Sequence, residues 1–189
     1  MATNLILALY KDKRTVFSFQ EIAMIAGEPD AARLKQRINY YVRTNKLFNL
    51  RRGVYAKDKY SPEELACKIY TPSYISLEYV LQKAGAVFQY NPAITVVSYL
   101  SRKLKVDNHL IQYRKMKENL LYNSAGITMN DRGVSMATPE RALLDKIYLD
   151  QECHVDVTSA LNKDEITKLF SVYHSVRIEK SALNILTNA

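Results

Sequence analysis

The stretch EPDAARLKQRINYYVRTNKLFNLRRGVYA, residues 28–56, decides how the first third of the chain folds. Apolar residues recur in it at the spacing of one helix face: Leu34, Ile38, Tyr41 and Val42. Pro29 suits the start of that helix, and Glu28 and Asp30 suit its positive end. The stretch therefore predicts a helix of about four turns that packs on one side.

The opposite face of this predicted helix is basic and polar. It carries Arg33, Gln36, Arg37, Tyr40, Arg43 and Thr44. Three of these residues are arginines and none is acidic, whereas an exposed helix face usually mixes both signs. The face is interpreted as a contact surface, with an ordinary solvated surface as the alternative.

A tight hairpin is expected after the basic helix. The short apolar runs LFNL and VYA flank Arg51, Arg52 and Gly53, and glycine can take the positive φ that such a turn needs. We expect both arginines to project from this hairpin beside the basic helix.

Two shorter helices are predicted before the basic one, over residues 2–10 and 18–26, with an extended segment between them at 14–17. Ser18 and Glu21 form a capping-box pattern at the start of the second helix, and Gly27 suits its end. The order helix, helix, long basic helix, hairpin is that of a winged helix-turn-helix, whose long helix enters the major groove of DNA.

The charge of the chain is concentrated in this first third. The 189 residues have a net charge of +8, and residues 1–59 hold 12 of the 27 Lys and Arg but only 5 of the 19 Asp and Glu. A local excess of this kind indicates a surface that meets a polyanion. The early apolar run LILALY is too short to span a bilayer and precedes its basic residues, so we expect a cytoplasmic protein with no membrane partner.

Residues 60–189 read as a second, α+β domain, with residues 1–59 as the DNA-binding domain. Strands are predicted at 94–99 and 109–116, with further candidates in LLYN (120–123) and GITMN (126–130). A helix is predicted from about residue 62, and a break follows it at 71–73. A second helix is predicted from Ser76, a third over 138–149, and residues 156–188 are predicted to be helical. Together these elements predict a small, mostly antiparallel sheet flanked by helices.

A second basic cluster lies in this predicted domain: Arg102, Lys103, Lys105, Arg114, Lys115 and Lys117. Lysines commonly protect exposed strand edges, and this interpretation is favoured over a second polyanion contact.

No motif for catalysis, metal binding or cofactor binding is present in the sequence. Cys67 and Cys153 are too isolated for a disulfide framework or a zinc site. Arg141 and Asp145 are four residues apart and are expected to form a structural ion pair across one helical turn. We therefore expect no enzyme, no catalytic residues, no metal and no cofactor.

Three stretches together resemble the AbiEi-type antitoxins of type IV toxin–antitoxin systems. They are RRGVYA (51–56), YTPSYISLEYVLQKAGA (70–86) followed by ITVVSY (94–99), and GVSMATPERALLDKIYL (133–149). The resemblance runs from about residue 19 to 149. It implies a winged-helix repressor of its own promoter, linked to abortive phage infection, whose second domain neutralises a nucleotidyltransferase-like toxin without forming a stable complex with it.

The predicted partners are therefore double-stranded DNA and a cognate toxin. Arg33, Gln36 and Arg37 are expected to read base edges, and Arg43 and Lys46 to touch phosphate. The remaining predicted contacts are Lys35, Tyr40, Arg51 and Arg52. Two alternatives stay open: a stand-alone winged-helix regulator without a toxin, and an RNA-binding second domain.

Overall fold

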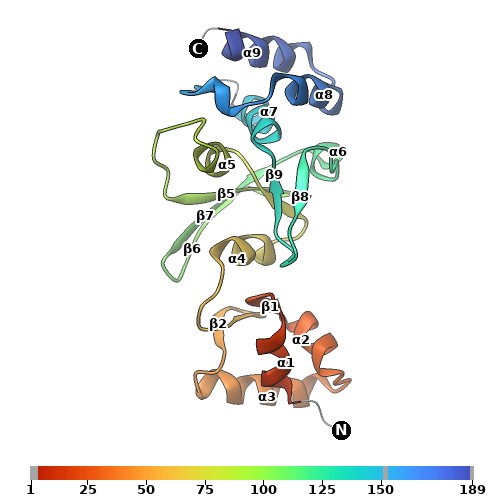
Figure 1. The fold of residues 1–189 in the computed structure, drawn as a ribbon. Helices are drawn as coiled ribbons and strands as arrows, with labels where there is room; N and C mark the ends of the chain where they lie inside the picture. The colour runs from red at the N-terminus through yellow and green to blue at the C-terminus, as the bar shows by residue number, and fades with distance from the viewer. Residues whose placement is uncertain (1–3, 151–152, 188–189) are drawn as a thin grey trace.

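The fold is mixed α+β, with nine α-helices and two sheets among the residues described (Figure 1). The structure is a computed structural model and describes residues 4–150 and 153–187. The molecule is elongated: a small N-terminal unit lies at one end, the larger sheet lies in the middle, and two helices form the other end (Figure 1).

The N-terminal unit combines three helices with a three-stranded antiparallel sheet of order β1-β3-β2. Its elements in chain order are α1 (Leu5–Lys11), β1 (Val16–Ser18), α2 (Phe19–Ala26), α3 (Ala31–Arg43), β2 (Phe48–Arg51) and β3 (Val54–Ala56). Residues 2 and 3 of the first predicted helix lie outside the described residues. The unit has its own core, made of Leu5, Leu9, Phe17, Ile22, Leu34, Ile38, Leu47 and Tyr55.

Capping side chains set where the helices of this unit begin and end. The predicted capping box of α2 is confirmed, because Ser18 Oγ accepts from Glu21 N and the Glu21 carboxylate accepts from Ser18 N. Gly27 ends α2 at a φ of +58°, as expected. The prediction that Pro29 starts α3 is wrong. Asp30 is the N-cap and its Oδ1 accepts from Ala32 N and Arg33 N, so α3 begins at Ala31.

The larger unit contains the remaining elements. They are α4 (Pro62–Ile69), β4 (Ser73–Ile75), α5 (Glu78–Lys83), β5 (Ala93–Ser98), β6 (Arg102–Val106), β7 (His109–Lys115), α6 (Glu118–Leu121), β8 (Ile127–Met129), β9 (Ser135–Ala137), α7 (Pro139–Asp150), α8 (Lys163–Tyr173) and α9 (Val176–Thr187), with a 3-10 turn at Thr158–Ala160. The predicted boundary at 59/60 lies between β3 and α4.

Three predictions for this unit are wrong. LLYN is not a strand: Leu120 and Leu121 belong to α6 and are both buried, although successive residues of a strand would face opposite sides. The break at 71–73 leads into β4, and the next helix begins at Glu78 rather than at Ser76. Residues 156–188 are not continuously helical, since α8 begins only at Lys163, after the 3-10 turn.

The sheet of the larger unit has six strands and is mixed, with antiparallel pairs in a narrow majority. Its order is β6-β7-β5-β4-β9-β8, and the β5–β7 and β4–β9 pairs are parallel while the other three are antiparallel. The order has a physical reason at one edge. β7 carries the fully buried Ile111 and Tyr113 and takes the inner position, whereas the lysine-rich β6 takes the edge.

The two units are docked through the start of α4. The Glu64 carboxylate is 2% exposed and accepts from Thr15 N at 2.6 Å, Thr15 Oγ1 at 2.9 Å and Val16 N at 3.0 Å. Val16 and Ala56 of the small sheet are fully buried in the core of the larger unit. The first unit is therefore fixed against the second by shared core and by buried hydrogen bonds.

A fully buried ion pair ties the larger sheet to its covering helices. Arg141 and Asp145 of α7 are both 0% exposed and are joined at 3.2 Å. Asp145 also accepts from the hydroxyls of Tyr74, Ser76 and Tyr173, at 3.0, 2.8 and 2.6 Å. The prediction of an ion pair is confirmed, but it belongs to a core network and not to an exposed helical turn.

Replacing Asp145 by Asn should destabilise the protein by about 3–5 kcal/mol, because the Arg141 charge would stay buried without its counter-charge. Urea unfolding measures this loss. Asp164→Asn, an exposed carboxylate in the first turn of α8, is the matched control and should change the free energy of unfolding by less than about 0.5 kcal/mol. Equal effects of the two substitutions would contradict the structural role of Asp145.

Candidate nucleic-acid interface

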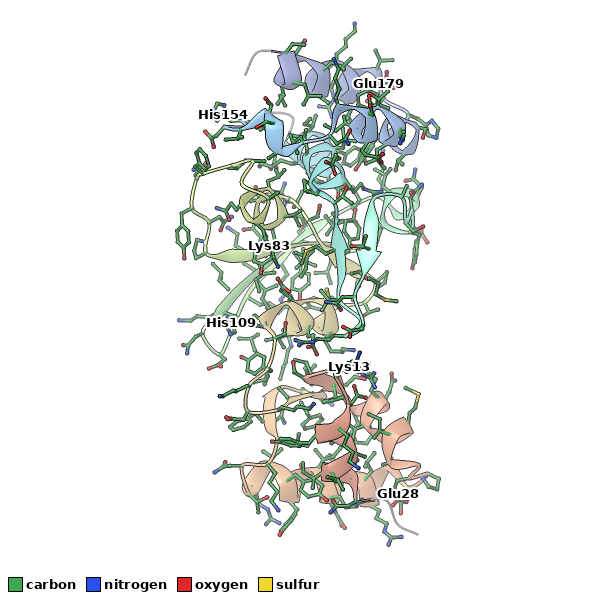
Figure 2. The ribbon with its side chains drawn as sticks, viewed as in Figure 1. Lys13, Glu28, Lys83, His109, His154 and Glu179 are labelled. Carbon is green, nitrogen blue, oxygen red and sulfur yellow. The ribbon has the colours of Figure 1, made fainter. Side chains whose placement is uncertain are left out.

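The basic helix α3 lies along the end of the molecule that faces away from the larger sheet (Figure 1). Its apolar side is fixed by Leu34 and Ile38, both fully buried in the core of the small unit. Figure 2 places Glu28, just before α3, at the same free end. The polar side of α3 therefore points away from the rest of the protein.

Most of the predicted contact residues are exposed on this end. They are Arg33, Lys35, Gln36, Tyr40 and Arg43 of α3, and Lys46 just after it. Tyr40 is 50% exposed, so its ring is available to a partner. These residues share one accessible surface, which we call the α3 face.

Arg37 is the predicted contact residue of α3 that is only partly exposed. Its side chain is 32% exposed, and Nη1 lies 3.6 Å from Glu28 Oε2. Arg33 Nε lies 3.8 Å from the same oxygen but keeps a side-chain exposure of 72%. Glu28 thus partly neutralises one end of the α3 face and restrains Arg37 more than Arg33.

Asn39 is an exposed polar residue of the α3 face that sequence reasoning missed. It lines a shallow hollow together with Gln36, Val42 and Arg43. Its spacing of three residues from Gln36 and four from Arg43 is a signal that could have found it. A side-chain amide here has the donor and acceptor that pair with an adenine edge.

The two arginines of the hairpin lie in different environments. Arg52 is exposed. Arg51 turns toward the larger unit, where its guanidinium lies 5.6 Å from the centre of the Tyr70 ring and Nη2 is 3.5 Å from the Tyr70 hydroxyl. Gly53 has a φ of +77°, which confirms the expected turn. Arg51 therefore serves the contact between the units, and Arg52 is the hairpin arginine that a partner can reach.

The second basic cluster does not form one patch. In the register of β6 and β7, Arg102 lies opposite Tyr113. The Tyr113 hydroxyl donates to Ala66 O of α4, so both residues are on the sheet face that α4 covers, and Arg102 Nη1 lies 3.1 Å from the Tyr70 hydroxyl. The neighbouring Lys103 belongs to the opposite face, since side chains alternate along a strand. Arg114 pairs with Asp150 of α7, while Lys105, Lys115 and Lys117 are exposed. Because β6 is an edge strand, this arrangement agrees with edge protection.

Neither cysteine lies in an environment that favours a reactive thiolate. Burial raises the pKa of the Cys67 thiol to about 11, and it does the same for Cys153. Within residues 4–150 and 153–187, no cluster of three or more His, Cys, Asp or Glu side chains could hold a metal ion. None of the helices in these ranges has the length and apolar content that crossing a membrane requires.

Replacing Arg51 by Ala should lower the free energy of unfolding by about 0.5–1 kcal/mol, because the stacking on Tyr70 is lost. Arg52→Ala removes an identical charge from the next residue and should leave stability unchanged. Urea unfolding of both variants checks the difference. A loss of stability in Arg52→Ala and not in Arg51→Ala would contradict this assignment.

Comparison of the chain with protein-family models and with curated proteins gives no match. The resemblance to AbiEi-type antitoxins therefore depends on the motifs alone. In the structure, P-S-Y-I-S-L-E covers β4 and the start of α5, and T-P-E-R-A-L-L-D covers most of α7 and the buried Arg141–Asp145 pair.

Proposed function

We propose that the protein is a DNA-binding transcriptional regulator whose N-terminal unit is a winged helix-turn-helix. The observation that carries this proposal is the α3 face, a basic and polar helix surface at the free end of the molecule. The hairpin that follows α3 carries the exposed Arg52. The element order α1-β1-α2-α3-β2-β3 supports it, because winged helices place a hairpin directly after the recognition helix.

In this proposal α3 enters the major groove with its first three turns against the bases. Arg33, Gln36 and Asn39 have side chains that can pair bidentately with guanine or adenine edges. Arg43 and Lys46, nearer the end of the helix, contact phosphate. Arg52 on the hairpin reaches the adjacent backbone or a narrow minor groove, where arginine is favoured electrostatically.

An antitoxin role is the second part of the proposal and depends on the resemblance. In it, the protein represses the promoter that it shares with a nucleotidyltransferase-like toxin, and the larger unit neutralises that toxin. The placement of Asp145 in the core supports a structural role for the T-P-E-R-A-L-L-D motif and not a catalytic one.

Gln36→Ala and Arg43→Ala should weaken DNA binding in different ways. Loss of the Gln36 base contact should cost about 1–3 kcal/mol and relax the preference for one base pair. Loss of the Arg43 phosphate contact should weaken all DNA sequences alike and lower the slope of log affinity against log salt by about 1. Fluorescence anisotropy with the DNA upstream of the coding sequence measures both effects.

The matched control is Lys163→Ala, a basic residue at the start of α8, at the opposite end of the molecule (Figure 1). It removes one positive charge without touching the α3 face, so affinity should stay close to that of the unchanged protein. If Gln36→Ala and Arg43→Ala bind as tightly as this control, the α3 face is not the DNA-binding surface.

The antitoxin role predicts that a neighbouring nucleotidyltransferase-like gene arrests growth when expressed alone. Co-expression of the full chain should restore growth, and so should the Gln36→Ala/Arg43→Ala double variant, because neutralisation is assigned to the larger unit. Failure of the unchanged protein to restore growth would refute the antitoxin role and leave the DNA-binding proposal standing.

A further inference from the structure

A cavity of about 810 Å³ opens on the larger unit, far from the α3 face. Its walls come from α5, the loop at residues 87–92, α7, the segment 153–156 and α9. His154 is one of the lining residues, and Figure 2 labels it on the side of the molecule where this loop lies. The volume is within the range of pockets that bind small molecules.

The polar groups of this cavity form a donor and an acceptor side by side. Lys146 Nζ donates to Glu78 Oε1 at 2.7 Å and to Asp150 Oδ2 at 2.7 Å. An ammonium has three donors and a carboxylate has a second oxygen, so one N–H of Lys146 and Oε2 of Glu78 have no partner among the described residues. Adjacent donor and acceptor groups match the edge of a nucleobase, which carries an acceptor beside a donor.

Two aromatic rings stand at the rim. Phe88 is 72% exposed and Tyr90 is 83% exposed, and both line the cavity. Exposed aromatic rings beside a cavity favour stacking on a flat ligand, since base–aromatic stacking contributes about 1–3 kcal/mol per base.

The rim is fixed in place by the segment that follows α7. Asp156 Oδ2 accepts from Phe88 N at 2.7 Å, and Ala86 O accepts from Asp156 N at 2.9 Å and from Val157 N at 3.2 Å. These bonds hold the end of the segment, at Asp156 and Val157, against the start of the aromatic loop. A pre-organised rim lowers the entropic cost of binding.

The charges of the cavity exclude anions. The lining residue Lys146 already contacts two carboxylates, and Asp156 adds another negative charge beside His154 at 3.2 Å. No excess positive charge is left among the described lining residues to bind a phosphate group. The ligand is therefore not an anion, which separates this site from the basic α3 face.

We infer that this cavity binds a free nucleoside, with the base stacked on Phe88 and Tyr90 and its edge paired with Glu78 and Lys146. The inference goes beyond the proposed DNA binding and does not depend on it.

Titration of the full chain, without DNA, with adenosine, cytidine, guanosine and uridine tests the inference by calorimetry. At least one nucleoside should bind saturably below about 1 mM. The Phe88→Ala/Tyr90→Ala double variant should bind it at least roughly tenfold more weakly. Tyr122→Ala removes a ring that is 65% exposed outside the cavity lining, and it should bind as the unchanged protein does.

A second experiment tests the pairing of the base edge with Glu78 and the exclusion of anionic ligands. Glu78→Gln should weaken binding, and the 5′-monophosphate of the bound nucleoside should bind several-fold more weakly than the nucleoside itself. The inference is overturned if none of the four nucleosides saturates, if the double variant binds like Tyr122→Ala, or if the monophosphate binds more tightly.

Discussion

The buried pair of Arg141 and Asp145 is the interaction on which the larger unit depends. Its hydrogen bonds reach Tyr74 of β4, the segment before β8, and the end of α8, so one pair of charges joins the sheet to two helices. The chain passes so close to α7 at Gly126 that an added Cβ would lie 2.9 Å from Arg141 Cβ. Every buried side-chain N or O atom of the described residues has a hydrogen-bond partner, so the network adds specificity without leaving a polar atom unpaired.

Glu64 plays the corresponding part at the other side of the sheet. Together with the Lys68–Glu21 ion pair at 2.6 Å, it joins α4 to the small unit. The molecule is thus a stack of layers in which apolar contact supplies burial, and a few buried polar groups fix the position of each layer on the next.

Local patterns in the sequence predicted α2, α3 and α7, because the apolar periodicity of each helix lies within it; for α3 only the first residue was misplaced. The exposure of most α3 residues followed from the same periodicity. The positions of β4 and β6 in the sheet could not be predicted from the sequence, since the order of strands depends on which strand can be buried between neighbours. The sequence also could not show that the Arg141–Asp145 pair is buried, because its i,i+4 spacing is the same in a core as on a surface. The contact of Arg51 with Tyr70 joins different units, and no local pattern encodes it.

The shared core at the junction limits how the protein can be divided. Val16 and Ala56 lie in the first unit but are buried by the second. A fragment ending near residue 59 would expose this apolar strip to water, and its edge would invite association with other chains. The first unit is consequently not an autonomous module that could be transplanted onto a different protein, since part of its core is supplied by the surface to which it is docked.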